Sequence, residues 1–278
     1  AAYTTRPAKR EMTIRHLLTH TAGLAYPFTS PTILAIQTQT GRDPKALPLL
    51  FDPGTKWNYS PATAVLGDII EKLSGRSIEA WDQERIFRPL GMVDTTYSPA
   101  AEKVARLATV HQRESGGLVE AANPPTYAPD VRGDGGLVST ASDYSAFLQM
   151  LLNEGRWRGR QLLRPGTVRL MARNQIGAVV VETMPAVMPR RSAPFPSGAG
   201  KDKFGFGFQI AATDGTAIRE MGVGSYSWGG TNNTHFWVDP KSGIAVVILM
   251  QVLPFYEAVS MDIVKRFERL IYQHLSSW

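Results

Sequence analysis

Apolar residues recur at helical spacing in the first part of the chain and at alternating spacing toward its C-terminus. The clearest helical stretch is 61–74, where apolar side chains fall on one face and Gly75 ends the run. We expect Ser60 to cap this helix, with Pro61 at its first position. Tyr59 then lies directly ahead of a helix N-terminus, where negative charge is favoured.

The spacing predicts shorter helices as well, each with a recognisable start or stop signal. They are the helix that Thr13 caps, residues 31–39, residues 77–88, the stretch that Thr140 or Ser142 caps, and residues 164–174. Residues 95–129 are mostly irregular, with a hairpin around Gly116-Gly117.

Alternation replaces helical spacing after residues 184–203, a Pro-, Gly- and Ser-rich stretch that we expect to be an exposed loop. Strands are predicted at 204–210, 217–223, 233–239 and 243–252, the last two joined by a tight turn. A final helix follows, and its spacing predicts a buried side. That side would consist of Val259, Ile263, Phe267, Leu270 and Ile271.

This order of elements predicts an α+β fold, in which an antiparallel sheet with covering helices meets a helical lobe. We expect the lobe, with its tyrosine motif, to span 1–175 and the sheet strands with the C-terminal helix to span 176–278, as one structural unit.

Composition excludes several classes of function. The 278 residues are 43% hydrophobic and 19% charged, as in ordinary globular proteins, and the absence of cysteine excludes disulfides and thiolate chemistry. The net charge of +6 is scattered, without a basic helix interleaved with aromatic residues, which argues against nucleic-acid binding. The longest apolar run, 244–250, is too short to span a bilayer.

Three candidate sites are disfavoured by their residue patterns. No serine has the G-x-S-x-G context of an α/β-hydrolase elbow, so we discard that fold. The glycine-rich segment 222–230 leads into a strand, whereas phosphate-binding loops lead into a helix. His16 and His20 have metal-ligand spacing but lack a third ligand, which favours two histidines making local hydrogen bonds.

Two further features have open interpretations at this point. Gly229-Gly230 could expose a backbone N–H as an oxyanion donor, although the spacing alone favours a plain glycine turn. Tyr59 could serve as a proton acceptor only with a nearby cation, because a helix N-terminus by itself shifts a phenol too little.

Four segments together resemble class C β-lactamase-like serine hydrolases, and most closely their esterase branch, the family VIII carboxylesterases. The resemblance covers nearly the whole chain and implies the β-lactamase/transpeptidase fold, with the site between the helical lobe and the sheet. The segments are HLLTHTAGL (16–24), FDPGTKWNYSPATAVLGDIIEKLSG (51–75), GGLVSTASDYSAFLQMLLNEG (135–155) and YSWGGTNNTHFWVDPKSGIAVVILMQ (226–251).

The resemblance assigns roles to two of the family's three motifs. Tyr59 begins the second motif, and Trp228-Gly229-Gly230 matches the third, so the N–H of Thr231 would be an oxyanion donor. β-Lactamases carry asparagine where Pro61 stands and lysine where Trp228 stands. Both departures imply neutral esters as substrates. Tyr26, Phe28, Tyr226 and Trp228 are candidate pocket walls.

The family's first motif, Ser-x-x-Lys, is absent, because no serine in the chain has lysine three residues later. We expect its place to lie ahead of Ala1, in a leading segment that is missing or forms a second chain. That segment would also supply the first strands and the helix bearing the nucleophile. This chain alone is then expected to be inactive.

The resemblance therefore implies a serine carboxylesterase that cleaves small-molecule esters through an acyl-enzyme, without metal or other cofactor. It also favours a cytoplasmic location, with neither nucleic acid nor membrane as partner. β-Lactamase or D-alanyl-D-alanine peptidase activity is one alternative. A non-catalytic binding relative is another.

Overall fold

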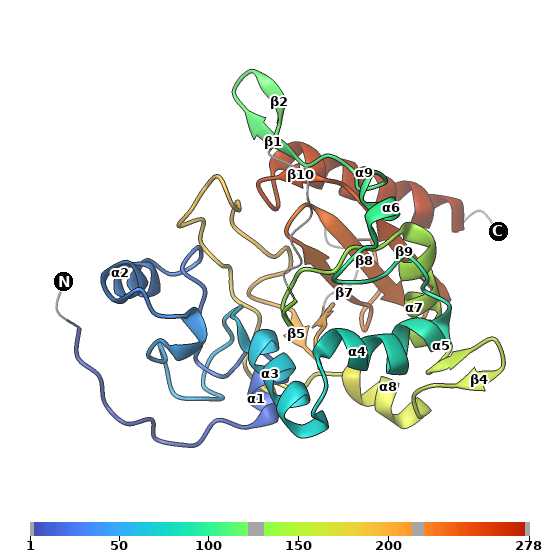
Figure 1. The fold of residues 1–278 in the computed structure, drawn as a ribbon. Helices are drawn as coiled ribbons and strands as arrows, with labels where there is room; N and C mark the ends of the chain where they lie inside the picture. The colour runs from blue at the N-terminus through green and yellow to red at the C-terminus, as the bar shows by residue number, and fades with distance from the viewer. Residues whose placement is uncertain (1–2, 122–130, 213–219, 276–278) are drawn as a thin grey trace.

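A five-stranded antiparallel sheet forms the frame of the computed structural model, which describes residues 3–121, 131–212 and 220–275 (Figure 1). Its strand order is β5-β6-β7-β8-β9, so each strand pairs with its neighbour along the chain. The strands are β5 (Lys203–Phe204), β6 (Gln209–Ile210), β7 (Tyr226–Gly230), β8 (Thr234–Asp239) and β9 (Ile244–Ile248).

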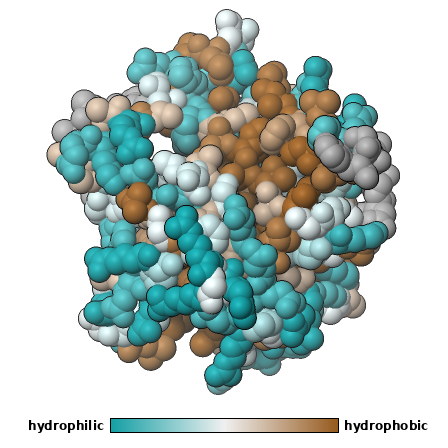
Figure 2. Space-filling model, turned by 90° about the vertical axis from the view of Figure 1, so that its right-hand side faces the viewer, coloured by the Kyte–Doolittle hydropathy of each residue, from teal (hydrophilic) through white to brown (hydrophobic). Residues whose placement is uncertain are grey.

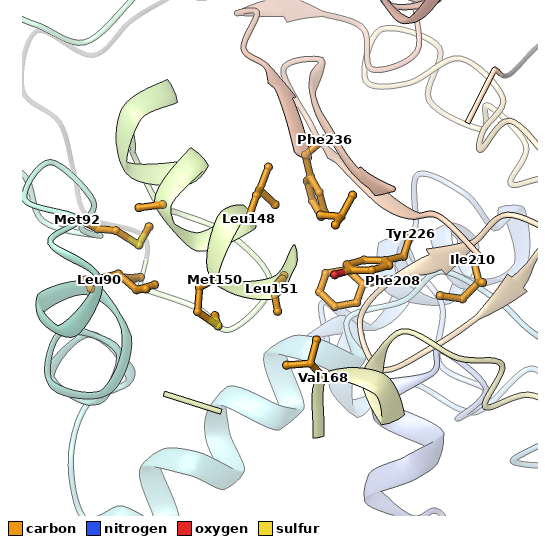
Figure 3. Packing of buried hydrophobic residues seen from close by; sticks show 13 residues of the cluster. Leu90, Met92, Leu148, Met150, Leu151, Val168, Phe208, Ile210, Tyr226 and Phe236 are labelled. Carbon is orange, nitrogen blue, oxygen red and sulfur yellow. The ribbon is translucent and has the colours of Figure 1, made fainter. Parts of the chain in front are cut away.

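Helices cover both faces of this sheet, because successive side chains of a strand point to opposite faces. Phe236 and Val238 of β8 pack with α7 (Ala141–Leu152), in the large cluster of Figure 3. Trp237, between them, packs on the other face with residues of α9 (Ala258–Leu275). The sheet is thus the middle layer of three.

The helical lobe lies beside the sheet and is built from short helices (Figure 1). Its helices are α1 (Ile14–Leu18), α2 (Pro31–Thr40), the 3₁₀ turn Pro44–Ala46, α3 (Ala62–Ser74), α4 (Ile78–Asp82), the π-helical turn Gln83–Phe87 and α5 (Arg88–Leu90). The remaining elements are α6 (Ala101–Val104), β1 (His111–Glu114), β2 (Gly117–Glu120), β3 (Arg156–Trp157), β4 (Arg160–Gln161), α8 (Pro165–Met171) and β10 (Val252–Leu253).

Several predicted elements are confirmed together with their local causes. The Thr13 side chain caps α1, and the Thr140 side chain accepts the hydrogen bond that caps α7. The hairpin around Gly116-Gly117 forms between β1 and β2, and the turn after Asp239 joins β8 to β9. The helix α7 lies in the first predicted part of the chain but packs on β8 and β9 of the second. The division of the chain at residue 175 stays a prediction.

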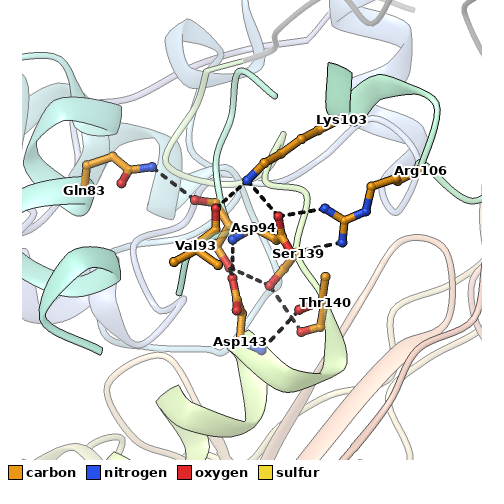
Figure 4. A network of polar contacts seen from close by, with 9 residues as sticks. Gln83, Val93, Asp94, Lys103, Arg106, Ser139, Thr140 and Asp143 are labelled. Carbon is orange, nitrogen blue, oxygen red and sulfur yellow. Dashed lines mark hydrogen bonds and ion pairs between the residues drawn. The ribbon is translucent and has the colours of Figure 1, made fainter. Parts of the chain in front are cut away.

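A polar network fixes the start of α7 against the segment that follows α5 (Figure 4). The buried carboxylate of Asp143 accepts hydrogen bonds from the Asp94 amide at 2.7 Å and from the Thr95 hydroxyl at 2.9 Å. Lys103 and Arg106 in turn pair with the Asp94 carboxylate. The network holds the first turn of the helix that supports the sheet.

Ser60 does not cap the central helix, contrary to the prediction. Pro61 occupies the N-cap of α3, and no side chain caps this end. Ser60 is fully buried, and its hydroxyl pairs with the His20 ring nitrogen Nδ1 at 3.3 Å. The Ser60 hydroxyl, which the sequence predicted as a helix cap, thus has a buried imidazole as its hydrogen-bond partner instead.

Three of the predicted strands differ from the structure. The prediction at 243–252 is divided into β9 and β10, which belong to different sheets. Residues 204–210 are divided between β5 and β6, because Phe206 turns away and its amide donates to the Met171 carbonyl at 2.9 Å. The prediction at 217–223 falls partly outside the described residues. The described part, 220–223, is not a strand. The amides of Glu220 and Met221 instead donate to the Glu268 carboxylate.

Residues 184–203 form a mostly irregular segment, as predicted, and the expectation that it is exposed holds for only part of it, such as residues 188–191. Met184, Ser192, Phe195 and Asp202 are each at most 3% exposed. The reason is that Phe195 inserts into an aromatic cluster between the lobe and the sheet. This segment is therefore a surface loop in part and contributes to the interior in part.

The buried side of α9 is also not the predicted one. Ser260, Val264 and Glu268 face inward, and the hydrogen bonds that Glu268 accepts hold the helix in this rotation. Of the predicted set, only Ile271 packs against the sheet. The others are between 39% and 65% exposed: Val259, Ile263, Phe267 and Leu270.

The sheet also has an unpaired edge at β9, which pairs only with β8 among the described strands. Figure 2 shows a broad hydrophobic area on this side of the molecule. Exposed sheet edges and large exposed apolar patches are features that can bind another chain. Within the described residues, no helix is both long and apolar enough to cross a membrane.

Candidate active site

Residues from distant predicted motifs meet in one aromatic cluster between the lobe and the sheet. The ring of Tyr59 lies 5.2 Å from that of Trp228 and 5.2 Å from that of Tyr26. Phe28 stacks on Tyr26 at 5.0 Å. The tyrosine ahead of α3 thus packs against a residue of the strand β7.

Tyr226 does not join this cluster, although it was predicted as a pocket wall. It is 1% exposed and packs against Phe208 at 5.1 Å, inside the core shared with α7. Tyr226 and Trp228 share one face of β7, but Trp228 lies further along the strand and reaches past the core toward Tyr59.

His20 is a supporting residue whose place the sequence did not reveal. Its ring lies 4.9 Å from Tyr59, and its carbonyl accepts a hydrogen bond from the Asn58 amide at 2.9 Å. It therefore holds the residue immediately before Tyr59. His16, by contrast, bonds through Nδ1 to the Thr13 amide, and within the described ranges no three metal-ligating side chains gather.

The edge of β7 next to the cluster is open. β6 pairs with Tyr226 and Ser227 only, so the outer edge from Trp228 to Gly230 has no strand beside it among the described residues. Thr231 follows on the surface, and its amide has no hydrogen-bond partner within the described ranges. This edge can donate backbone N–H groups to a carbonyl oxygen.

Gly229 is needed for close packing behind that edge. A Cβ at this position would lie 2.8 Å from Nδ1 of His235, which is itself stacked on Phe255. Any side chain there would push β7 away from β8 and move the open edge. Close packing therefore requires glycine at this position, in addition to the plain turn that the spacing suggested.

Burial raises the pKa of Tyr59 to about 12, and the negative charge of Asp134 adds to this rise. Polar interactions with Trp228 and Tyr26, and the positive charge of Arg191, lower this pKa. Tyr59 is consequently a neutral phenol at neutral pH. To accept a proton it needs a further cation close by, as the sequence predicted.

Two buried histidines make stability depend on acidic pH. Burial lowers the pKa of His20 to about 3 and that of His235 to about 4, below the unfolded value of ~6.5. The folded state thus excludes protons that the unfolded state binds. The free energy of unfolding that the two neutral histidines contribute is complete above pH ~6.5. It is lost as pH falls toward 4, at up to about 1.4 kcal/mol per pH unit for each histidine.

We therefore expect the melting temperature to fall between pH 6.5 and 4, with a smaller fall in His235→Gln than in the unchanged chain. Thermal unfolding followed by circular dichroism at matched ionic strength measures both. Equal slopes in the two chains would show that His235 does not titrate in this way.

A five-stranded antiparallel sheet covered on both faces, with a site against a helical lobe, is the β-lactamase/transpeptidase-like α+β fold. The chain belongs to the Beta-lactamase family, whose model matches residues 1–269. An uncharacterised Mycobacterium tuberculosis protein is 33% identical over 90% of this chain and 65% of its own length. The chain therefore spans slightly under two thirds of that relative.

Other relatives are esterases and acyltransferases. Lovastatin esterase of Penicillium rubens is 29% identical over 98% of this chain and 72% of its own length. A simvastatin synthase structure from Aspergillus terreus superposes with a TM-score of 0.82 at 28% identity, covering 98% of this chain and 68% of that one. The predicted fold and the predicted family resemblance are confirmed by these matches.

Proposed function

We propose that this chain forms the substrate-facing part of a serine carboxylesterase that cleaves neutral esters through an acyl-enzyme. The observation that carries the proposal is the meeting of Tyr59 with the open edge of β7, with 5.2 Å between the rings of Tyr59 and Trp228. Acyl transfer requires a proton-transferring group close to oxyanion donors.

The nucleophile in this proposal is the serine of a Ser-x-x-Lys segment supplied in addition to these 278 residues, none of which forms that motif. The unpaired edge of β9 and the uncovered apolar face of α9 support such a segment, because they offer a strand partner and an apolar surface. Without the segment, the chain should not form an acyl-enzyme.

The reaction then has two halves. The serine oxygen bonds to the ester carbonyl carbon, and Tyr59, kept as a phenolate by the lysine ammonium, takes the serine proton. The amides of Thr231 and of the serine hold the oxyanion, and Tyr59 returns the proton to the departing alkoxide. Water next attacks the acyl-enzyme by the same route and releases the acid and the serine.

Neutral esters fit the site better than β-lactams. Trp228 places an indole, and not an ammonium, where a substrate carboxylate would bind, and Pro61 offers no side-chain amide. Acyl transfer to an alcohol is a second candidate, since Aspergillus terreus monacolin J acid methylbutanoyltransferase is 29% identical over 96% of this chain and 68% of its own length.

The test joins a Ser-x-x-Lys segment ahead of residue 1 and compares that protein with the 278-residue chain. We expect p-nitrophenyl butyrate turnover only in the joined protein, and its loss when the serine is replaced by alanine. Nitrocefin turnover faster than ester turnover would instead favour a β-lactamase. Butyryl transfer to an added alcohol would favour the acyltransferase, and no turnover of any substrate would favour a binding relative.

A further inference from the structure

A cation without an anionic partner stands at the rim of the aromatic cluster, and neither the sequence motifs nor the proposed mechanism uses it. The guanidinium of Arg191 lies over the ring of Phe28, 4.7 Å from its centre, and its side chain is exposed. Among the described residues, no carboxylate pairs with Arg191 and no acceptor takes a hydrogen bond from its side chain. The preceding residue, Arg190, instead pairs with Glu114 at 2.7 Å.

The backbone that carries Arg191 is held by hydrogen bonds on both sides. Its amide donates to the Met188 carbonyl at 2.8 Å, and its carbonyl accepts from the Phe255 amide at 3.0 Å. The amide of Val187 donates to the Phe28 carbonyl at 3.1 Å, so the segment with the cation is bonded to the segment with the ring. This anchoring places the guanidinium in advance, which lowers the entropy that binding a ligand would cost.

Phe28 and Tyr26 connect this cation to the site of the proposed reaction. Phe28 stacks on Tyr26 at 5.0 Å, and the Tyr26 ring lies 5.2 Å from that of Tyr59. All three residues are partly exposed. The positive charge of Arg191 also lowers the pKa of Tyr59, as expected of a cation close to the cluster. A substrate whose ester lies at Tyr59 can therefore extend along these rings to Arg191.

The chemistry of the guanidinium identifies the group that would bind there. Its plane presents several N–H donors in a fork that matches the two oxygens of a carboxylate. Phe28 offers no oxygen or nitrogen acceptor, so the contact with the ring leaves these donors available. Hydrogen bonds between a guanidinium and a carboxylate are charge-assisted and are stronger than neutral ones. The free donors of Arg191 thus fit a carboxylate.

We propose that Arg191 is a specificity-determining residue: it binds a carboxylate at the end of the substrate remote from the reacting ester, while Phe28 and Tyr26 pack against the apolar chain between the two groups. The proposal rests on the proposed function, in which the reacting ester group is itself neutral and lies beside Trp228. The preferred substrates are then esters that also carry a remote carboxylate, such as half-esters of dicarboxylic acids.

The first test titrates the 278-residue chain with monobutyl suberate, a long half-ester, and with butyl methyl suberate, the corresponding neutral diester. Without the Ser-x-x-Lys segment neither ligand should be consumed. NMR follows the side-chain Nε–H signal of Arg191, which is identified as the signal absent from Arg191→Lys. We expect the half-ester to shift this signal until it saturates and the diester to leave it in place. Added salt should weaken the binding, because the two charges are then screened.

Arg190→Gln is the matched control for Arg191→Gln, because Arg190 carries the same charge one residue earlier but pairs with Glu114. Measured through the indole N–H signal of Trp228, Kd for the half-ester should rise about 10-fold in Arg191→Gln and stay unchanged in Arg190→Gln. Arg191→Lys should be intermediate, because it keeps the charge without the fork.

An Arg191 signal that neither ester moves, or that both move equally, would overturn the proposal. Equal losses of affinity in Arg191→Gln and Arg190→Gln would overturn it as well. Circular dichroism of each variant confirms that the fold is the same in the chains compared.

The joined protein separates this proposal from the proposed function. There, the ratio of kcat/KM for p-nitrophenyl hemisuberate to that for p-nitrophenyl butyrate should fall about 10-fold in Arg191→Gln, through KM. A merely structural role would lower both values equally and leave the ratio unchanged. If the joined protein hydrolyses no ester, the proposed function fails, and the titration of the 278-residue chain still decides whether Arg191 binds a carboxylate.

Discussion

Tyr59→Phe, made in the protein that also carries the Ser-x-x-Lys segment, should lower kcat/KM for p-nitrophenyl butyrate by about 10²- to 10⁴-fold. The substitution removes the oxygen that accepts the serine proton and leaves the ring that packs against His20, Tyr26 and Trp228. The melting temperature should therefore change little. Steady-state kinetics and thermal unfolding of the same preparation measure both quantities.

Tyr144→Phe is the control for this loss. Tyr144 of α7 packs with Phe147 of the same helix and with Phe236 of β8, in the core and away from Tyr59, so removal of its hydroxyl should leave ester hydrolysis unchanged. If Tyr59→Phe retained most of its rate, or if both variants lost activity equally, Tyr59 would not be the proton-transferring group.

Gly23→Ala should cause the largest loss of stability among conservative substitutions near the site, about 2–4 kcal/mol in the free energy of unfolding. Gly23 has φ of +92°, and a Cβ there would collide with the carbonyl oxygen of Phe51. Its carbonyl also accepts a hydrogen bond from the Leu50 amide at 2.8 Å. This contact joins the segment after α1 to the segment that leads to Tyr59.

Gly41→Ala separates the two causes of that loss. Gly41 also has a left-handed backbone, with φ of +65°, but a Cβ at this position would meet no atom within 4 Å. The substitution should therefore cost only the backbone strain, about 1 kcal/mol. Urea unfolding of both variants measures the difference, and equal losses would mean that the contact with Phe51 is not tightly packed.

Local sequence was sufficient wherever one side chain satisfies a neighbouring backbone group. Thr13 was predicted as one cap and either Thr140 or Ser142 as another, and the structure has the caps at Thr13 and Thr140. The predictions fail where a residue distant in sequence forms the hydrogen bond instead of the local partner. Ser60 bonds to His20 instead of capping α3, and Phe206 bonds to Met171 instead of continuing a strand.

Helical spacing likewise located α9 but not its buried side. Apolar residues cover more of its circumference than the sheet contacts, so periodicity cannot say which strip faces inward. The hydrogen bonds from Glu220 and Met221 to Glu268 settle this, and they join residues far apart in the sequence. The same reasoning applies to 184–203, whose loop composition did not reveal that Phe195 enters the interior.

Sequence by itself determined most helices, the succession of a helical part, strands and a final helix, the family, and the candidate residues Tyr59 and Trp228-Gly229-Gly230. The reason is that caps, turns and motifs each depend on a few consecutive residues. Only the tertiary structure decided which of these residues meet. It brought Tyr59 to Trp228, placed Tyr226 in the core, and set Asp134 behind Tyr26. The physical reason is that burial and charge at a site arise from contacts between distant segments, and no short stretch of sequence contains both partners of such a contact.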